Sequence, residues 1–582
     1  MTRSSADALL GRMMLAFEGE RFPRWVAARL RDAPAAGMTI FRHHNVRSPG
    51  QVRELIEAFQ RAGAVNAWGG AGGAGTAPLL VAADQEGGQL LGLGEGPTAF
   101  AGSMALGAVG DERLAERVGA AIGRESRAMG VNVVYAPVLD VAVEPGNVGL
   151  GIRSFGDDPA AVGRLGAAVV RGLQGSGVAA TGKHFPGLGE VRQDPHHGLG
   201  VVLGEREALD TMALAPFRAA IDAGVRLVMS AHVALPALTG DPTLPATLSA
   251  TVMEGLLRRE LGFRGVTISD ALDMRALAQG AAQAVEIVAL VRAGVDLLLC
   301  STDRRAQRRI ETTLAAAASR GLFDARELAA SGARVAALRA WLGAAGPAPD
   351  LEVVGCSEHR ALSRELAERS ITLVRGWRGD AIAAAGRRGG ADAAPAGRRG
   401  GSGAAAHRHE GPGAAARRHE ATGAATSPAL IPADATILAI MPQPTDLTPA
   451  DTSSTVEPGL GRALRTRFAS VEEIVVGMAP TVAEIAGLRE RATAFDAVVV
   501  GTIDAIRQPG QLQLVRAIAA SGRPIVAVAL RTPWDVAHYP AEVAAACTYS
   551  ILPDPLEALA AALAGAIPFA GRLPVAVDGV AG

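Results

Sequence analysis

Lysine is almost absent from this sequence of 582 residues. Of its 57 basic residues, 56 are arginine and one is lysine, at position 183. Arginine presents a planar fork of donors, whereas lysine carries a compact ammonium on a flexible stem. In a chain that uses arginine nearly everywhere else, the remaining lysine indicates a position that needs a compact ammonium. Lys183 is therefore a candidate for a functional site.

Cysteine is scarce as well. Cys300, Cys356 and Cys547 lie far apart in the sequence, so they form neither the close pairs of a zinc site nor a disulfide framework. Each is expected to be a small buried apolar residue. A reducing cytoplasm is therefore the expected location.

The chain has no run of 18 apolar residues, so no membrane span is predicted. The N-terminal apolar stretch is interrupted at Gly11-Arg12 and does not have the features of a signal peptide. The formal net charge of −1 gives no general attraction to nucleic acid or to membranes. A small substrate, neutral or modestly charged, fits this composition better than a polyanion.

Hydrophobic residues make up 49% and charged residues 20% of the chain, as in globular proteins, and the length indicates two or more domains. Over residues 1–345, short apolar runs alternate with helical stretches, among them 115–129, 158–176 and 205–224. Eight strands alternating with helices predict an α/β fold with a (β/α)8-like TIM barrel. The expected strands are 13–17, 37–41, 79–83, 131–136, 179–181, 227–231, 265–269 and 295–299.

The rest of the chain has three parts. Residues 346–375 are interpreted as a linker and the start of a second domain. Residues 376–428 repeat short Gly-Arg-Arg and Arg-His-Glu segments without periodic apolar residues, which predicts a disordered insertion. Residues 429–582 predict a smaller three-layer α/β sandwich domain, in which Asp535 and His538 are expected to be structural. Its expected strands are 436–441, 473–476, 496–501 and 524–530.

Polar residues stand at the ends of four of the expected barrel strands. In this fold the loops after the strands converge on one face, where active sites lie. Four separate strand ends therefore predict one common site. The residues are Asp84, Lys183 with His184, His232 and Asp270.

The segment from 183 to 197 is the densest in chemical groups. Glycine and proline punctuate residues 183–190, which predicts a loop. Asp194 and His196 lie two residues apart, and a carboxylate at that spacing can orient an imidazole and raise its basicity. An imidazole at neutral pH suits a group that must give a proton and then take one back.

Asp270 is delivered to the end of a strand by four apolar or β-branched residues. A carboxylate there can act as a nucleophile or as a metal ligand. The alternative role is that of an N-cap that opens a helix over 271–278. Asp84 precedes Gln-Glu-Gly-Gly, whose glycines let a ligand approach the backbone, and Arg153 offers a fixed cation.

These stretches together resemble glycoside hydrolase family 3, and within it the bacterial β-N-acetylglucosaminidases that recycle cell-wall fragments. They occur in the family's order over most of residues 1–300, and the C-terminal part, including 571–575, resembles the family's α/β sandwich. The matching stretches are 84–88, 153–155, 183–189, 194–196, 230–232 and 269–270.

The resemblance implies a retaining exo-β-N-acetylhexosaminidase that needs no cofactor or metal and acts on a small carbohydrate, a GlcNAc-containing glycoside or muropeptide. It implies that Asp270 is the nucleophile and that His196, oriented by Asp194, is the general acid/base. The second domain is then expected to contribute no catalytic residue. The residues implied to hold the terminal sugar are Asp84, Arg153, Lys183, His184 and His232.

The chain departs from the family's pattern at several positions. Gln89 and Gly92 stand where the family usually has arginines, which puts the preference for the sugar in doubt. Leu188 stands where His is frequent, Pro195 where Ser or Thr is frequent, and Ala271 where a second Asp is frequent.

Three other functions are compatible with the sequence. A sugar-binding protein without catalysis would explain the missing arginines, and a phosphorylase would use phosphate instead of water in the second step. A metal-dependent barrel hydrolase has enough candidate ligands but lacks a His-x-His motif at a first strand end. Those ligands would be Asp84, His184, His196, His232 and Asp270.

Overall fold

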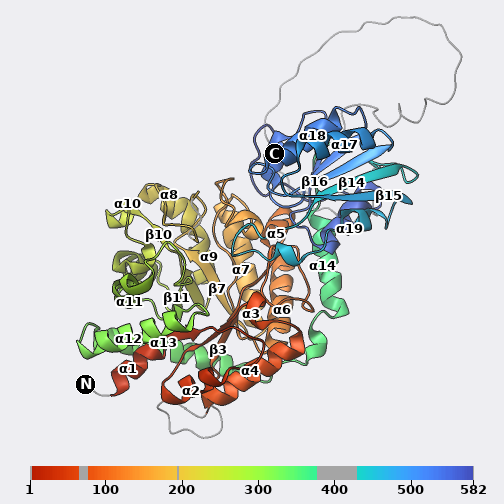
Figure 1. Cartoon of the computed structure of the whole chain (residues 1–582). Helices are drawn as coiled ribbons and strands as arrows, with labels where there is room; N and C mark the ends of the chain where they lie inside the picture. The colour runs from red at the N-terminus through yellow and green to blue at the C-terminus, as the bar shows by residue number, and fades with distance from the viewer. Residues whose placement is uncertain (1–2, 65–76, 193–195, 377–428, 581–582) are drawn as a thin grey trace, which may run out of the picture.

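The computed structural model describes residues 3–64, 77–192, 196–376 and 429–580. Figure 1 shows a barrel domain followed by a sheet domain that lies against it. The segment predicted to be an insertion lies outside the described residues except for Gly376, and so does Asp194. Among the helices of the described ranges, none is long and apolar enough to span a membrane.

Eight parallel strands follow one another around the barrel in chain order (Figure 1). Each pairs with the next, the last pairs with the first, and a parallel bridge between Ile268 and Leu297 closes the ring. All eight expected strands are confirmed. They are β1 (Met13–Leu15), β2 (Gly37–Ile40), β3 (Leu80–Ala83), β6 (Val133–Val134), β7 (Ala179–Phe185), β9 (Leu227–Ser230), β11 (Val266–Ser269) and β12 (Leu298–Leu299).

The strand β7 is longer than the sequence predicted, and the expected loop at 183–185 is wrong. The Lys183 N–H donates to the Pro137 carbonyl at 3.1 Å, and the Ala231 N–H donates to the Phe185 carbonyl at 2.7 Å. Pairing on both sides therefore extends β7 by four residues beyond Thr181. The consequence is that Lys183 and His184 are held by a strand and not by a loop.

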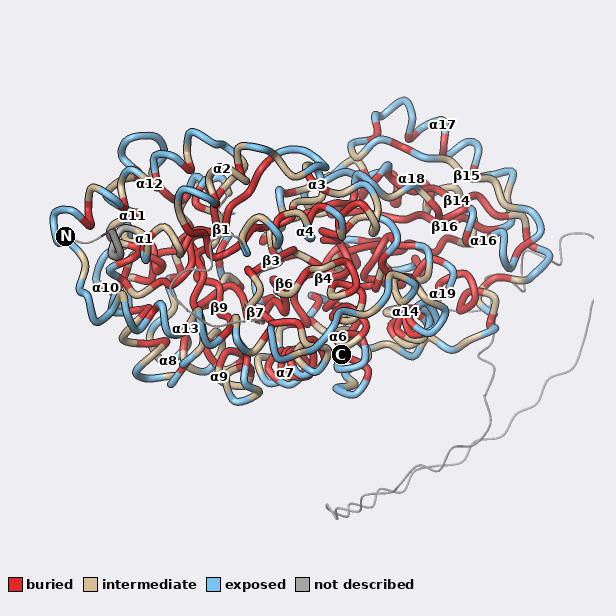
Figure 2. Tube along the Cα trace, turned by 90° about the horizontal axis from the view of Figure 1, so that it is seen from below, coloured by how far each residue is buried: buried red, intermediate tan, exposed pale blue. Residues whose placement is uncertain are grey.

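Apolar side chains from the strands fill the barrel interior, and a second apolar layer packs between the strands and the outer helices. The inner core includes Met14, Leu80, Ala82, Val133, Tyr135, Ala179, Met229 and Ile268. Figure 2 shows the buried segments at the centre of each domain and the exposed helix surfaces outside. This layering leaves the carboxyl ends of the strands as the polar face of the barrel.

The helices α6 (Glu112–Ala128) and α7 (Pro159–Gly175) confirm two of the expected helical stretches. Each begins at an aspartate, Asp111 or Asp158, whose side chain accepts backbone N–H groups of the first turn. The two helices lie so close that a Cβ at Gly172 would be 2.1 Å from the Glu116 carbonyl oxygen. Glycine is therefore required at this crossing.

The stretch 205–224, expected as one helix, is broken. It consists of α8 (Arg206–Ala208), the π-helical turn η2 (Leu209–Ala213) and α9 (Ala215–Asp222). The Leu214 N–H donates to the Leu209 carbonyl, five residues back, instead of four. Pro216 has no N–H to donate, which suits its place in the first turn of α9, where the regular helix resumes.

The second domain is a six-stranded sheet in the order β13-β18-β17-β16-β14-β15, in which only β13 is antiparallel to its neighbour. The four expected strands are confirmed, and β13 and β18 were missed. Alanine dominates β18, and alanine is a poor strand former. The strands are β13 (Thr372–Arg375), β14 (Thr436–Pro442), β15 (Ser470–Val476), β16 (Ala497–Thr502), β17 (Ile525–Ala529) and β18 (Ala544–Cys547).

Helices cover both faces of this sheet, which confirms the three-layer sandwich. Side chains of α17 and α18 pack on one face, and side chains of α14, α16 and α19 pack on the other. The helix α14 also packs against α5 and α6 of the barrel domain. The helices are α5 (Ser103–Val109), α14 (Ser357–Ser370), α16 (Leu460–Leu464), α17 (Val482–Ala492), α18 (Pro509–Ala519) and α19 (Pro553–Leu563).

Asp535 lies in the core of the second domain, as a structural residue would. It has no exposed surface, and Thr502 Oγ1 donates to its Oδ2 at 2.6 Å. Burial raises the pKa of the Asp535 carboxyl to about 6, although the Thr502 hydrogen bond lowers it. The folded domain therefore binds a proton here that the unfolded chain releases at a lower pH.

This linkage predicts a pH-dependent stability. Because the folded pKa lies above the unfolded value, the free energy of unfolding should fall by about 2–3 kcal/mol as the pH rises from about 4 to 6. In Asp535→Asn this contribution disappears, so the variant should be destabilised less at pH 7.5 than at pH 4.5. Urea unfolding at both pH values measures this difference. Asp434→Asn, at an exposed aspartate of the same domain, is the control. An equal destabilisation of the Asp535 variant at both pH values would contradict the assignment.

Candidate active site

Lys183 joins two carboxylates at the carboxyl end of the barrel. Its Nζ lies 2.6 Å from Asp84 Oδ1 and 2.6 Å from Glu86 Oε1. Burial lowers the pKa of the Lys183 ammonium, but the fields of Asp84 and Glu86 outweigh burial, and the pKa rises above its ordinary value. Lys183 and Glu86 are buried, whereas the Asp84 side chain is 24% exposed. Asp84 is therefore the member of this trio that can reach a ligand.

Arg153 forms a bidentate pair with Glu86. Its Nε donates to Glu86 Oε2 and its Nη2 donates to Glu86 Oε1, both at 2.8 Å. Burial raises the pKa of the Glu86 carboxyl, but the charges and hydrogen bonds of Arg153 and Lys183 lower it to about 2. Glu86 is thus an anion held between two cations.

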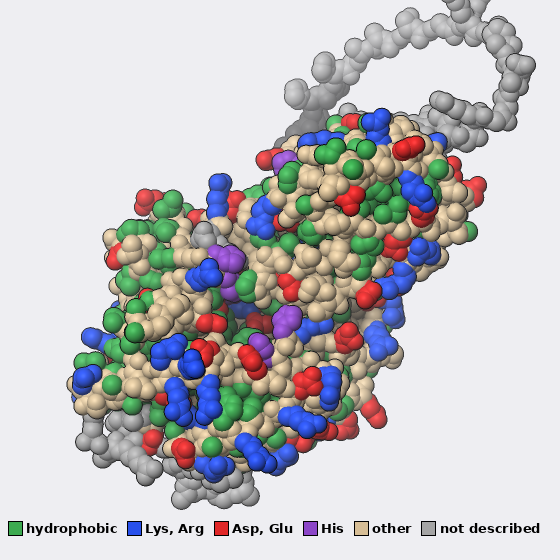
Figure 3. Space-filling model, viewed as in Figure 1, with side chains coloured by type: hydrophobic (Ala, Val, Ile, Leu, Met, Phe, Trp, Pro, Cys, Tyr) green, Lys and Arg blue, Asp and Glu red, His purple; other side chains and the backbone are tan. Residues whose placement is uncertain are grey.

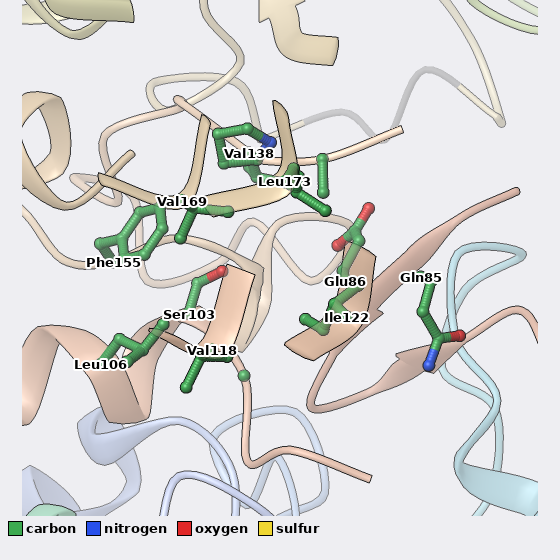
Figure 4. A pocket seen from close by; sticks show the side chains of 13 residues that line it. Gln85, Glu86, Ser103, Leu106, Val118, Ile122, Val138, Phe155, Val169 and Leu173 are labelled. Atoms are coloured by element: carbon green, nitrogen blue, oxygen red, sulfur yellow. The ribbon is translucent and has the colours of Figure 1, made fainter. Parts of the chain in front are cut away.

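The surroundings of Glu86 explain why it needs both cations. A cavity of about 20 Å³ lies beside it, and most of the other lining side chains are apolar (Figure 4). Gln85 points to the other side of the strand β4 (Gln85–Gly87), where its Oε1 accepts the Leu93 N–H at 3.0 Å. An ionised carboxylate beside apolar groups is stable only when it is paired and hydrogen-bonded.

The His184 ring connects this cluster to a further carboxylate, Asp140. His184 Nδ1 lies 2.7 Å from Asp140 Oδ2, and His184 Nε2 lies 3.4 Å from Arg153 Nη2. Asp140 also accepts the backbone N–H groups of His184 and Leu188, at 3.2 and 2.7 Å. With Nδ1–H donating to Asp140, Nε2 is left to accept from Arg153. Asp140 thereby fixes the orientation of the ring.

The turn after β7 is held against the loop that follows β6. Asn147 Nδ2 donates to the Leu188 carbonyl at 2.8 Å. A Cβ at Gly189 would lie 1.7 Å from the Val141 carbonyl oxygen, so only glycine permits this approach. These contacts anchor the first half of the segment that leads to His196.

Asp270 follows β11 directly. Its backbone N–H donates to the Ser230 carbonyl at 3.1 Å, and its Oδ1 accepts the Ala271 N–H at 2.7 Å. No helix follows at 271–278, and the next α-helix, α11, begins at Gln283. The alternative of an N-cap is therefore wrong, and Asp270 is not required to open a helix.

Three histidines act on the ionisation of Asp270. Burial raises the pKa of this carboxyl, but the fields of His184, His232 and His196 and the Ala271 hydrogen bond lower it below its ordinary value. Groups from β7, from the turn after β9 and from the segment around His196 thus lie near enough to Asp270 for their charges to act on it. The predicted partner of His196, Asp194, lies outside the described residues.

His232 is placed differently from the other candidates. It has no exposed surface, and its Nε2 lies 3.2 Å from the Ala271 carbonyl, to which Nε2–H can donate. Burial lowers the pKa of the His232 ring, and the field of Asp270 raises it. As placed, His232 supports the Asp270–Ala271 turn.

A hollow opens on the barrel face, with histidine side chains on either side and acidic and basic groups within it (Figure 3). In the described part of the chain, no cluster of three or more His, Cys, Asp or Glu side chains is arranged to hold a metal ion.

Sequence reasoning missed two residues of this site. Glu86 lies two positions after Asp84, in a segment with a predicted role, but no role was predicted for Glu86 itself. Asp140 follows the expected strand 131–136 after Pro-Val-Leu, which is the same pattern of a polar residue after a strand. Both carboxylates thus had a recognisable position in the sequence. Their roles become clear only from their contacts, because Glu86 pairs with Lys183 and Asp140 with His184.

Comparisons with known proteins identify the family to which this fold belongs. The N-terminal domain of glycosyl hydrolase family 3 matches residues 12–338, more than half of the chain. The chain therefore belongs to glycosyl hydrolase family 3.

Individual relatives show how far the likeness extends. A protein named beta-hexosaminidase A, from Pseudoalteromonas piscicida, is 34% identical over 58% of this chain, and the match spans 59% of that relative's length. A beta-hexosaminidase from Nitrosomonas eutropha is 32% identical over 52% of this chain and 84% of its own length. The solved structure of a family 3 beta-N-acetylglucosaminidase from Paenibacillus sp. str. FPU-7 is 32% identical, with a TM-score of 0.84 over 99% of both chains.

The buried cluster generates a prediction for Glu86→Gln. Removal of one charge leaves Arg153 and Lys183 under-compensated, so the variant should lose about 3–5 kcal/mol of stability. The wild-type contribution depends on a pKa lowered to about 2, so it should be present above about pH 4.5 and disappear as the pH falls toward 2. Denaturant unfolding at pH 7 and pH 3 measures both effects.

The matched control is Glu472→Gln. Glu472 forms the same bidentate pair with Arg491, through contacts of 2.5 and 2.7 Å, but on the surface. Exposed pairs contribute little to stability, so this variant should resemble the wild type. Similar losses in both variants would show that burial of Glu86 is not the cause.

Proposed function

We propose that this chain is a retaining exo-β-N-acetylglucosaminidase that hydrolyses terminal β-linked N-acetylglucosamine. The observation that carries the proposal is the position of Asp270, which directly follows β11 at the carboxyl end of the barrel and whose Oδ1 is held by the Ala271 N–H at 2.7 Å. An anion in this place suits attack on a glycosidic carbon. The similarity to proteins named beta-hexosaminidase and beta-N-acetylglucosaminidase supports the choice of sugar.

In the proposed first step, Asp270 attacks the anomeric carbon while protonated His196 gives its proton to the leaving oxygen. The carbon–oxygen bond to the aglycone breaks, a glycosyl ester with Asp270 forms, and His196 becomes neutral. In the second step neutral His196 takes a proton from water, whose oxygen displaces Asp270. Each displacement inverts the anomeric carbon, so the product has the same configuration as the substrate.

The groups that hold the sugar follow from their exposure and polarity. Asp84 presents an accessible carboxylate that can accept hydrogen bonds from sugar hydroxyls, and buried Lys183 fixes its orientation. Arg153 and His184, whose Nη2 and Nε2 atoms lie 3.4 Å apart, are the other side chains expected to contact the sugar. We propose that His232, which donates to the Ala271 carbonyl, acts on the sugar only through Asp270.

Two further aspects stay predictions from the sequence. The natural substrate is expected to be a muropeptide in peptidoglycan recycling, in the cytoplasm. The orientation of His196 by Asp194 is expected from their spacing. Both refine the proposed reaction without changing its chemistry.

The reaction can be tested with aryl β-N-acetylglucosaminide and aryl β-glucoside. The purified protein should release the phenol from the first substrate and much less from the second, with retained configuration by NMR. Asp270→Asn should lower kcat by at least roughly 10³-fold, because the nucleophile is lost. Its matched control, Asp222→Asn, removes an exposed carboxylate at the end of α9 and should keep most of the activity.

Phosphate separates hydrolysis from phosphorolysis. Rates that stay constant as inorganic phosphate is added, with free sugar as the product, fit a hydrolase. A sugar 1-phosphate product would replace hydrolysis by phosphorolysis at the same site. A folded wild-type protein that turns over neither glycoside would contradict the proposal and favour a binding role.

A further inference from the structure

The second domain contacts the barrel at the hairpin that begins with Asp84. The Asp84 hairpin, residues 84–93, contains the antiparallel strands β4 and β5 (Leu90–Leu91). Thr452 of the second domain donates its N–H to the Gln89 carbonyl at 2.8 Å, and the Leu91 N–H donates to Thr452 Oγ1 at 3.1 Å. Gln89 Nε2 also donates to the Ala450 carbonyl at 3.3 Å. The tip of the hairpin is thus bonded to another domain.

The segment that makes these contacts leaves the second domain after β14. It is coloured cyan in Figure 1 and extends over the barrel domain. Asp451 shapes it, because Oδ1 accepts the Ser453 N–H at 2.9 Å and Oδ2 accepts the Leu447 N–H at 3.1 Å. The segment is therefore a folded turn centred on one buried carboxylate.

Arg531 ties this turn and the hairpin together. It follows β17, is 2% exposed, and donates from Nη1 to Asp451 Oδ2 at 2.7 Å. Its Nη2 donates to Gln89 Oε1 in the hairpin. One guanidinium therefore holds a carboxylate of its own domain and an amide of the barrel.

Backbone hydrogen bonds connect the tip of the hairpin to Asp84 and to the barrel. The Gly92 N–H donates to the Asp84 carbonyl at 2.8 Å, so the end of the hairpin is bonded to its beginning. On its barrel side, the Gly88 N–H donates to the Phe100 carbonyl at 2.8 Å. Gln89 lies three positions from Gly92, which is bonded to Asp84, and three positions from Glu86. A displacement of Gln89 is therefore expected to move both carboxylates.

We propose that Arg531 and Asp451 form a clamp between the domains that sets the position of Asp84 for sugar binding. Arg531 is then a positioning residue of the second domain, not a catalytic one. A buried ion pair stabilises little compared with apolar residues of the same volume, because both charges lose their hydration. What this pair adds is a defined geometry at the hairpin. The sugar-binding part of the inference rests on the proposed function.

The test compares Arg531→Met, Arg531→Lys and Thr452→Val in the full chain. Methionine keeps much of the volume but removes every donor, lysine keeps the charge and one contact, and valine removes the Thr452 hydroxyl from the hairpin. The matched control is Arg369→Met, since Arg369 of α14 bridges to Asp111 of the barrel domain at 2.8 Å without contacting the hairpin.

Two readouts are independent of each other. Hydrogen–deuterium exchange of the peptide 85–93 should be faster in Arg531→Met and Thr452→Val, intermediate in Arg531→Lys, and unchanged in Arg369→Met. For the aryl N-acetylglucosaminide, KM should rise roughly tenfold in Arg531→Met while kcat changes less than about threefold, because Asp84 is displaced and Asp270 is not. A general loss of structure would instead affect both constants and the control peptides.

The outcomes separate the two proposals. Unchanged exchange in both Arg531→Met and Thr452→Val would overturn the clamp, whatever the activity. Faster exchange with an unchanged KM would show that the contact does not set Asp84, and would also overturn it. A wild-type protein without turnover would overturn the proposed function alone. Hydrogen–deuterium exchange of the peptide 85–93 and the affinity for free N-acetylglucosamine would then test the clamp.

Discussion

The arrangement of the site depends on the burial of one carboxylate, Glu86, between Arg153 and Lys183. An anion beside apolar walls is stable only if cations come within contact distance, and both cations here are themselves buried. These ion pairs connect β4, β7 and the turn at Arg153 to one another. The same ion pairs fix the positions of Asp84 and His184, because Asp84 pairs with Lys183 and His184 contacts Arg153.

The same constraint explains why the groups proposed to hold the sugar lie on strands instead of loops. Lys183 and His184 lie within β7, whose backbone bonds on both sides resist displacement. Asp140 holds the His184 ring from the neighbouring segment, so the orientation of the ring is independent of any ligand. Groups held in this way lose little freedom when a sugar binds, which favours affinity without further ordering. The group assigned to proton transfer, His196, lies beyond the anchored turn at Gly189.

Most residues of the candidate site could be selected from the sequence because they follow a repeated pattern. A short apolar run ending in a polar residue identified Asp84, Lys183, His184, His232 and Asp270, and these strand ends lie on one face of the barrel. The pattern was less informative about Glu86 and Asp140, because their roles depend on Lys183 and His184, which lie 97 and 44 positions away in the sequence. The predicted strand at 179–181 was also shorter than β7, because the glycine and proline after residue 185 suggested that the loop begins at residue 183.

The sequence alone determined the fold class, the eight barrel strands, the sandwich and the family resemblance, since hydrophobic periodicity and strand-end motifs are local properties. Only the tertiary structure decided which charges neutralise one another, that His232 supports the turn after Asp270, and that Arg531 reaches Gln89 across more than 400 residues. These outcomes depend on burial and on distances between segments remote in the chain. A charged residue has the same appearance in the sequence whether water or another domain surrounds it.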